Sequence, residues 1–368
     1  MILVTGGAGF IGSHLVDELL ARGHNVRVLD AFLQQVHGSS PYQLPSDVEV
    51  VQGDVRDRAV VDKALENIEV VFHDAAEVGV GQSMYEIERY VGGNTFGTAT
   101  LLEAIVARRN QIRKLIVASS MSIYGEGAYR CRRCGPATPA LRPLNQLESR
   151  DWEMHCPACA SNLEPVATSE TKPLDPASVY AVTKQDQEQL CIIVGRAYGI
   201  PTVALRYFNV YGTRQALSNP YTGVAAIFSS RLLNGQPPIV YEDGLQSRDF
   251  THVKDIVQAN LRAMESDAAN FQAINVGTGV STSVIRVAQL LADGLGVSIE
   301  PIVVGRFREG DIRHCFADIT RARKLLGYEP TVSLEQGIPQ LLDWARGQQA
   351  VDGVERAANE LQSHGLVR

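Results

Sequence analysis

The sequence predicts an α/β protein with a doubly wound parallel sheet, followed by a smaller C-terminal domain. Three observations support this prediction. In residues 1–12, a short β-branched run that begins at Met1 passes through glycines directly into a helical pattern. Strand-like and helix-like segments then alternate through the first half of the chain, which is typical of a parallel sheet with helices on both faces. At 368 residues and 45% hydrophobic content, the chain is large enough for two lobes.

The individual elements follow from periodicity, in chain order. After the first strand, Ile11, Leu15 and Leu19 recur every four residues, and Gly23 ends that helix. Further strands are expected at residues 25–30, 48–52, 69–73 and 114–119, with helices between them, for example over residues 94–108. The polar tail after Gln348 predicts a loosely held helix.

The glycines after the first strand predict a nucleotide-binding loop. Gly6, Gly9 and Gly12 stand three residues apart between a strand and a helix, and Phe10 and Ile11 begin that helix. Glycine permits a tight turn and a close approach of the backbone to a pyrophosphate, and the helix N-terminus favours the phosphate charge. This is the pattern of a Rossmann-type dinucleotide-binding fold.

An acidic residue at the end of the second expected strand predicts the cofactor. Asp30 can accept hydrogen bonds from both ribose hydroxyls of the adenosine, whereas a 2′-phosphate would be repelled there. Since no arginine follows directly, the sequence favours NAD over NADP. Asp54, after the third strand, either receives the adenine amine or is a solvated aspartate in a turn.

A tyrosine and a lysine four residues apart predict acid–base chemistry. Tyr180 and Lys184 share a helix face, so the ammonium is expected near the phenol, where it would lower the tyrosine pKa. Ser119, Ser120 and Ser122 form a hydroxyl cluster at the end of the fifth strand, at the sheet edge where such folds bind ligands. Two of these three serines are expected to be only caps or turn residues.

Composition excludes several classes of function. The chain carries 34 Lys and Arg against 41 Asp and Glu, a net charge of −7, so nothing indicates binding to nucleic acid. No apolar stretch approaches the length of a membrane span. Because Met1 already belongs to the first strand, no signal peptide is expected, and the sequence predicts a cytoplasmic protein.

Taken together, the motifs resemble a known family. The glycine loop, Asp30, Ser120 and the Tyr180–Lys184 pair, followed by residues 205–212 and 248–250, are similar to extended short-chain dehydrogenase/reductases. Within these, the match is to nucleotide-sugar epimerases and dehydratases such as UDP-galactose 4-epimerases. The resemblance runs from the first residue to about Trp344, interrupted by one insertion.

The resemblance implies a mechanism and a homodimer. Tyr180 would abstract the proton of the sugar 4-hydroxyl while C4 passes a hydride to NAD⁺, and Ser120 would hydrogen-bond the reacting oxygen. Lys184 would tune Tyr180 and hold the nicotinamide ribose. The 4-keto sugar would then turn over and take the hydride back on its other face, with no net redox change. The resemblance also implies which residues contact each ligand. The cofactor would be contacted by Gly6, Gly9, Phe10, Ile11, Gly12, Asp30, Asp54, Val55, Ala75, Asn94, Tyr180 and Lys184. The nucleotide-diphosphate sugar would be contacted by Ser120, Asn209, Arg248 and Arg308.

Both arginines of that set would neutralise the substrate diphosphate, a bidentate task that suits arginine; the alternative is that they form surface ion pairs. The chain also departs from the dehydratases, which carry Thr-Asp-Glu where Ser120, Met121 and Ser122 stand here. Since the acid and base for eliminating water are missing, dehydration is not expected. Asp74 stands where the family usually has an apolar residue, and no consequence is assigned to it.

An insertion between the serine cluster and Tyr180 carries two Cys-x-x-Cys pairs. Cys131, Cys134, Cys156 and Cys159 match a Cys₄ zinc ribbon, and four thiolates leave no open position, so the zinc would be structural. The alternative is two disulfides or free thiols. The ribbon is expected to lie over the sugar pocket.

The sequence predicts five segments. Residues 1–126 form the dinucleotide-binding domain, residues 127–168 the insertion, and residues 169–212 the rest of the first domain with the catalytic helix. Residues 213–348 mainly bind the substrate, although part of 244–275 returns to the first domain, and residues 349–368 form the tail.

The substrate prediction rests on a looser resemblance. The insertion and residues 219–224 are similar to those of dTDP-L-rhamnose 4-epimerases, which implies conversion of dTDP-L-rhamnose to dTDP-6-deoxy-L-talose. Alternatives are 4-epimerisation of a UDP-hexose or UDP-glucuronate, or a net 4-reductase or dehydrogenase. A dinucleotide sensor without catalysis would not need Tyr180, Lys184 and Ser120 together.

Overall fold

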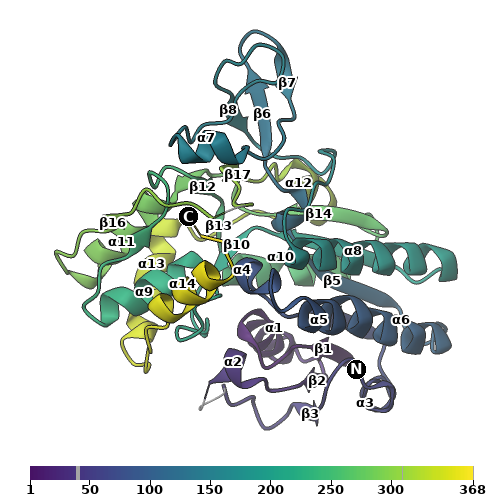
Figure 1. Cartoon of the computed structure of the whole chain (residues 1–368). Coiled ribbons are helices and arrows are strands. Elements are labelled where there is room, and N and C mark those ends of the chain that lie inside the picture. The colour runs from purple at the N-terminus through teal and green to yellow at the C-terminus, as the bar shows by residue number, and fades with distance from the viewer. Residues whose placement is uncertain (39–41, 309, 368) are drawn as a thin grey trace.

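The computed structural model describes residues 1–38, 42–308 and 310–367. A seven-stranded parallel sheet forms its larger lobe (Figure 1), in the order β14-β9-β5-β4-β1-β2-β3. The four later strands of the first half begin or end within one residue of their predicted bounds. The sheet strands are β1 (Ile2–Thr5), β2 (Val26–Asp30), β3 (Glu49–Gln52), β4 (Val70–His73), β5 (Lys114–Ser120), β9 (Thr202–Tyr207) and β14 (Gln272–Val276).

Helices cover both faces of this sheet because alternate strand residues point to opposite sides. Ile2 and Val4 belong to the core on one face, and Leu3 belongs to the core on the other. The first face is covered by α1 (Phe10–Ala21), α10 (Val253–Glu265) and α12 (Thr320–Leu326), and the second by α3 (Arg58–Ala64), α6 (Gly97–Ala107) and α8 (Val179–Tyr198). The predicted doubly wound α/β fold is confirmed.

Short elements connect these layers. They are α2 (Gln34–His37), α4 (Val80–Ser83), α5 (Ile87–Tyr90), the π-helix η1 (Val91–Phe96) and the 3₁₀ turn η2 (Met121–Tyr124). The helix predicted over residues 94–108 is therefore shorter and begins after a π-helical turn.

A smaller lobe with its own core follows β9. Tyr211, Phe250, Val287 and Leu341 are among its buried residues. As predicted, part of residues 244–275 returns to the larger lobe, because α10 packs on α1 and β14 joins the sheet. The smaller lobe contains β10 (Asn209–Tyr211), α9 (Val224–Leu233), β11 (Ile239–Val240), β12 (Ser247–Arg248), β13 (Phe250–His252), β15 (Thr282–Ser283), α11 (Val284–Leu295), β16 (Ile302–Val303), β17 (His314–Cys315) and α13 (Leu334–Ala345).

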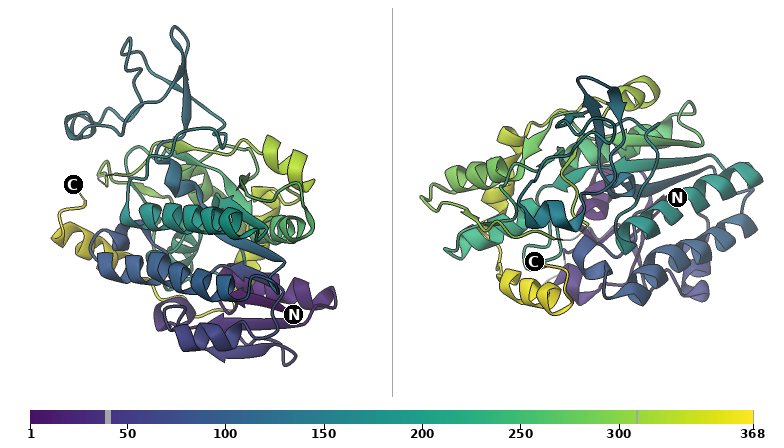
Figure 2. Two further views of the ribbon diagram at one scale, coloured as in Figure 1. Left: turned by 90° about the vertical axis from the view of Figure 1, so that its right-hand side faces the viewer. Right: turned by 45° about the horizontal axis from the view of Figure 1, so that its top comes forward.

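The cysteine-bearing insertion forms a three-stranded antiparallel sheet that stands off one end of the molecule (Figures 1 and 2). Its elements are β6 (Ala128–Cys131), β7 (Gly135–Ala137), α7 (Leu144–Glu148) and β8 (Glu164–Val166). Tyr129, Met154 and Leu163 pack around Cys131 and Cys156 in a small core. The insertion therefore has an apolar centre of its own.

The tail is a packed helix, not the loosely held one that its polar sequence predicts. Ala357 and Leu361 of α14 (Val354–Ser363) are buried, and Glu360 accepts hydrogen bonds from Tyr85 and Tyr221. Val367 then forms an isolated antiparallel bridge to Arg308.

Across the described residues, the structure contains no helix with the length and apolarity needed to cross a bilayer.

Candidate active site

A cavity of about 640 Å³ opens at the carboxyl ends of the sheet strands, between the two lobes. This is the edge at which open α/β sheets bind their ligands, and the volume lies within the usual range for such sites. The cavity gathers nearly every residue that the sequence predicted for cofactor or substrate: Gly6, Gly9, Phe10, Ile11, Gly12, Asp30, Asp54, Val55, Ala75, Ser120, Tyr180, Lys184, Asn209, Arg248 and Arg308.

The glycine loop is built so that side chains would not fit. A Cβ on Gly12 would lie 2.3 Å from the carbonyl oxygen of Gly6, and Gly6 itself has a φ of +69°. The loop therefore turns tightly against the first turn of α1. No side chain of the described residues caps this helix, and Phe10 and Ile11 line the cavity. The amides of the first turn are thus available to a phosphate.

Two carboxylates, Asp30 and Asp54, line the cavity near the glycine loop. Asp30 Oδ2 accepts a hydrogen bond from the Ala8 amide at 3.0 Å, and Oδ1 accepts one from the Phe32 amide at 2.8 Å. Asp30 is thereby held rigidly at the end of β2 beside the glycine loop. Asp54 lines the cavity and pairs with Arg56 at 2.7 Å, and its predicted contact with the adenine amine stays a prediction.

Asn94 does not line the cavity, and its role as a cofactor contact stays a prediction. It is fully buried in η1, where its Oδ1 accepts the Glu77 amide at 2.6 Å and its Nδ2 donates to Thr183 Oγ1 at 2.9 Å. The wider turn of the π-helix directs this side chain inward. Asn94 therefore shapes the loop at residues 77–79, which does line the cavity.

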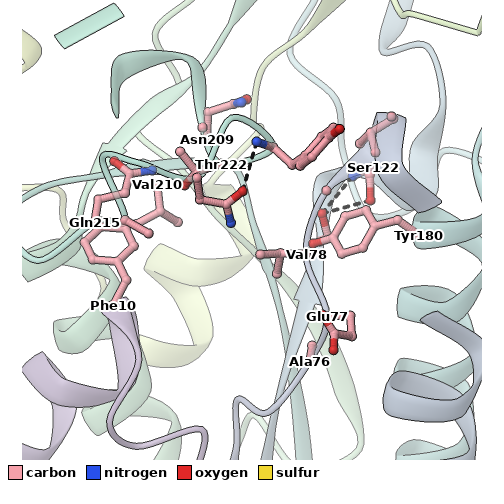
Figure 3. Close-up of a pocket in the computed structure, with 18 of the residues that line it drawn as sticks. Phe10, Ala76, Glu77, Val78, Ser122, Tyr180, Asn209, Val210, Gln215 and Thr222 are labelled. Carbon is pink, nitrogen blue, oxygen red and sulfur yellow. Dashed lines mark hydrogen bonds between the residues drawn. The ribbon is translucent and has the colours of Figure 1, made fainter. Parts of the chain in front are cut away.

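The hydroxyl groups meet at the end of β5 (Figure 3). Ser120 Oγ accepts a hydrogen bond from the Ser122 amide at 3.2 Å and lies 2.9 Å from Ser122 Oγ. Ser119, by contrast, donates to the buried Glu188 at 2.7 Å, so it has the structural role expected for part of this cluster. Tyr180 lies beside Ser122 in Figure 3, in the first turn of α8, and its amide donates to Ser83 Oγ at 3.0 Å.

The expected effect of Lys184 on Tyr180 is wrong in this structure. Lys184 Nζ donates to Gln187 Oε1 at 2.8 Å. Burial raises the pKa of Tyr180, while a hydrogen bond with Ser120 acts in the opposite direction. The shift differs from the prediction because the cost of burying the phenolate outweighs the stabilisation by its neighbours.

Asp74, which was assigned no role from the sequence, is the acidic neighbour of Lys184. Burial raises the pKa of Asp74 to about 7, which the charge of Lys184 opposes, and burial lowers the pKa of Lys184 to about 8. Asp74 lines the cavity, and its Oδ2 has no hydrogen-bond partner among the described residues. Asp74 and Lys184 thus form a buried pair of opposite charge in the cavity that also contains Tyr180.

The opposite wall comes from the smaller lobe (Figure 3). Asn209, Gln215 and Thr222 face Tyr180 and Ser122 across the cavity. Within the described chain, Asn209 Oδ1 and Gln215 Oε1 are buried without a hydrogen-bond partner. Such atoms are costly unless a ligand satisfies them, so this wall is suited to a polar ligand.

The two predicted arginines lie at the same end of the cavity. Arg248 donates to the carbonyls of Ile312 at 2.7 Å and Arg313 at 3.0 Å, and Arg308 lies over the ring of Tyr241, 4.3 Å from its centroid. Neither arginine forms an ion pair with another described residue, and the contacts given for them are carbonyls and an aromatic face. Both guanidinium groups line the cavity, where they offer positive charge to an anion.

The tail adds a wall that the sequence prediction missed. Val354, Ala357, Ala358 and Leu361 of α14 line the cavity. Their spacing of three to four residues is the signal that could have revealed a buried helix face.

The four predicted cysteine ligands come together at the far end of the insertion. Their sulfur atoms all lie within 4.8 Å of one another, and Cys131 and Cys159 are 3.6 Å apart. The predicted position over the sugar pocket is wrong, since no residue of 127–168 lines the cavity. The ribbon projects outward because its strands pair only with each other.

Comparison with known proteins gives two family matches. The model of the NAD-dependent epimerase/dehydratase family matches residues 2–145, and that of GDP-mannose 4,6-dehydratase matches residues 162–341. A dTDP-L-rhamnose 4-epimerase of Burkholderia thailandensis is 35% identical over 347 residues, covering 93% of this chain and 94% of the relative.

Two solved structures show the same architecture. A UDP-glucose 4-epimerase of Thermotoga maritima with UDP-glucose is 33% identical, covers 94% of this chain and 98% of its own, and has a TM-score of 0.77. A UDP-glucuronic acid 4-epimerase of Bacillus cereus, in complex with UDP-glucuronic acid and NAD, is 30% identical with the same coverage and a TM-score of 0.76.

Proposed function

Because this chain belongs to the NAD-dependent epimerase/dehydratase family, we propose that it is a nucleotide-sugar 4-epimerase acting through a transient 4-keto sugar. The observation that carries the proposal is the meeting of Tyr180, Ser120 and Lys184 in one cavity with the glycine loop. Acid–base groups and a dinucleotide site side by side are what oxidation and re-reduction of a hydroxyl require.

The residues present fit NAD⁺. The lack of a side chain on Gly12 lets the loop backbone approach the first turn of α1 closely, that turn offers its amides, and Asp30 lines the cavity beside the loop, where a ribose would lie. A negative carboxylate at that position supports NAD⁺ over NADP⁺. When bound, NAD⁺ supplies a reversible acceptor for the hydrogen at the sugar C4.

The protein's own groups handle the proton. Tyr180 takes the proton from the sugar 4-hydroxyl and later returns it, while Ser120 hydrogen-bonds the same oxygen. Lys184 lies one helical turn after Tyr180 and supplies positive charge to this part of the cavity, and the charge of Asp74 raises the pKa of Lys184 and so helps to keep it protonated. Met121 and Ser122, which follow Ser120, offer neither an acid nor a base for eliminating water.

Arg248 and Arg308 bind the substrate diphosphate in this proposal, and Asn209 and Gln215 supply polar contacts to the sugar or its phosphates. Each of these groups lines the smaller-lobe side of the cavity. The first substrate that we propose is dTDP-L-rhamnose, which gives dTDP-6-deoxy-L-talose. The Burkholderia thailandensis relative supports this choice, and the Thermotoga maritima and Bacillus cereus structures make UDP-hexose and UDP-glucuronate the next to test.

The test is a panel of dTDP- and UDP-sugars followed by sugar proton NMR and by absorbance at the NADH wavelength. An epimerase changes the configuration at C4 of one sugar with no net change in NADH absorbance. Stoichiometric formation or consumption of NADH would instead identify a dehydrogenase or reductase, and the absence of turnover with bound NAD⁺ would indicate a sensor.

For the insertion we propose a structural Zn²⁺ bound by Cys131, Cys134, Cys156 and Cys159. The grouping of four sulfur atoms supports it, because a tetrahedral zinc with bonds of about 2.3 Å holds its ligands close together and binds four thiolates without an open position. Elemental analysis should find about one zinc per chain, and Cys134→Ser with Cys156→Ser should remove it. Free titration of all four thiols in the native protein would contradict the proposal.

We also propose a homodimer formed through α5, η1 and α8, which lie side by side on one flank (Figure 2). The support is an exposed apolar strip on this flank, in which Phe96 is 57% and Ile193 is 61% exposed. Light scattering should show a dimer that Phe96→Asp with Ile193→Asp converts to a monomer. Val280→Asp, at an exposed apolar residue elsewhere, is the control. A wild-type monomer would refute the proposal.

A further inference from the structure

A buried ion-pair network joins the cysteine-bearing insertion to the smaller lobe. Arg142 of the insertion makes a two-fold contact with Glu242, at 2.9 and 2.8 Å. The same Glu242 accepts from Arg313 at 2.9 Å. The side chains of Arg142, Glu242 and Arg313 are only 2%, 4% and 0% exposed. Charges this deeply buried are tolerated only when they are paired, so the three groups must hold one geometry.

A second residue of the insertion holds the same arginine. Glu153 Oε1 accepts from Arg313 Nη2 at 2.6 Å, and Glu153 Oε2 lies 3.4 Å from His314 Nε2. Asp243 completes the set around Arg313 at 2.7 Å. The insertion thus supplies one cation and one anion to a network whose other members belong to the smaller lobe.

The ion-pair network is connected to Arg248 through backbone carbonyl groups. Arg313 and its neighbour Ile312 present the carbonyls that orient the guanidinium of Arg248. Arg142 Nη2 also donates to the carbonyl of Asp311, at 3.0 Å, and Asp311 lines the cavity. The insertion therefore fixes the backbone that aims Arg248.

A parallel route leads to Arg308. Glu242 follows Tyr241, whose ring lies under the Arg308 guanidinium, and the Glu242 amide donates to the Arg306 carbonyl at 2.8 Å. Glu242 also has a φ of +53°, a left-handed conformation that a residue with a side chain rarely adopts. Its paired carboxylate offsets that strain and keeps Tyr241 in place.

We propose that Arg142 and Glu153 are positioning residues for the anion-binding end of the cavity, and that the insertion serves as a buttress for Arg248 and Arg308. The inference rests on the proposed function, since it takes a nucleoside diphosphate as the ligand of these arginines. The buttress acts on substrate binding and not on the cofactor, because the contacts that the described residues make around Asp30 and Gly12 involve no member of the network.

The test is Arg142→Met, which removes the charge but retains much of the stem. Calorimetry with dTDP and UDP, without any turnover, measures the binding directly. Affinity for the nucleoside diphosphate that the wild type binds should fall at least about tenfold, since a displacement of about 1 Å in a positioned group can cost about 10²-fold. NAD⁺ affinity and zinc content should stay at wild-type values. In turnover, KM for the sugar nucleotide should rise while kcat changes less.

Arg132→Met is the matched control. Arg132 is an exposed arginine of the same insertion that pairs with Glu164, outside the network, so this variant should bind the nucleoside diphosphate normally. Arg142→Lys should restore affinity only in part, because lysine keeps the charge but not the two-fold contact. Glu153→Gln, at a partly exposed residue, should weaken binding with little risk to folding.

The outcomes separate this inference from the proposed function. If the wild type binds neither dTDP nor UDP, the proposed function fails and takes the inference with it. If the wild type binds one of them and both Arg142→Met and Glu153→Gln bind it equally well, the proposed function stands and the buttress is refuted. If Arg142→Met lowers the affinity for NAD⁺ as much as the affinity for the nucleoside diphosphate, the buttress is also refuted, because the substitution would then have disturbed the whole fold.

Discussion

Replacing Gly12 by alanine tests the cofactor loop most directly. The new Cβ would lie 2.3 Å from the Gly6 carbonyl oxygen and 2.7 Å from the Gly7 Cα, both of which are backbone atoms. Ordinary contacts between nonbonded heavy atoms are about 3.5–4.0 Å. Since neither backbone atom can rotate away, the first turn of α1 must move off the loop by about 1 Å.

The expected loss of NAD⁺ affinity follows from the strain that the extra methyl group would cause in the original loop conformation. Forcing one extra methyl into a well-packed position costs about 1–3 kcal/mol. If NAD⁺ binding has to restore the original loop, that strain is subtracted from the binding free energy. At about 1.4 kcal/mol for each tenfold change, NAD⁺ affinity should fall by about 5- to 150-fold.

The assay is titration of cofactor-free protein with NAD⁺, by calorimetry or by quenching of intrinsic fluorescence. Gly294→Ala is the control, because it makes the same change inside a helix of the smaller lobe. Its Cβ would meet the Leu342 Cδ1 atom, the mobile end of a side chain, at 2.7 Å. NAD⁺ affinity within twofold of wild type in Gly12→Ala would show that the loop does not hold the cofactor.

Three further results are expected. Asp30→Ala should weaken the preference for NAD⁺ over NADP⁺, because the negative charge that repels a 2′-phosphate is gone; equal affinity of the wild type for both cofactors would contradict this. Tyr180→Phe should still bind NAD⁺ but lose at least about 10²–10⁴-fold in turnover, measured with the NMR assay, since the proton acceptor is removed; near-normal turnover would mean that another group is the base. Hydrogen bonds from His314 and Arg313 lower the pKa of Glu153 from 4.5 to about 2, so its stabilising contribution is present above pH 4.5 and is lost as the pH falls toward 2. Denaturation in urea at pH 6 and pH 3 should show a smaller acid-induced loss in Glu153→Gln than in the wild type, and an equal loss would contradict the ion pair.

Much of the larger lobe could be predicted because its signals are local. The strand before Gly6, the glycine spacing and the acidic end of β2 each occupy a few consecutive residues, and a parallel sheet brings the strand ends to one edge. Tyr180 and Lys184 share a helix face by spacing alone. For this reason the cavity contains nearly all of the predicted residues.

Other features depend on contacts between distant segments, which periodicity does not contain. Asn94 was expected in a regular helix but lies buried in a π-helical turn. The pKa of Tyr180 is raised by its burial, which depends on how the whole chain packs around the first turn of α8. Asp74 gains its raised pKa in the same way.

The sequence by itself determined the fold of the larger lobe, the dinucleotide loop, the acid–base pair and the four cysteines, since each is a pattern of near neighbours along the chain. Only the tertiary structure decided that the tail helix lines the cavity and that the insertion stands clear of it. It also decided that Arg142 lies against Glu242, a contact that joins residues 100 positions apart. Such a pair forms only where the folded chain brings two distant surfaces together. Burial then makes the loss of either charge costly in free energy, which the residue types alone do not indicate.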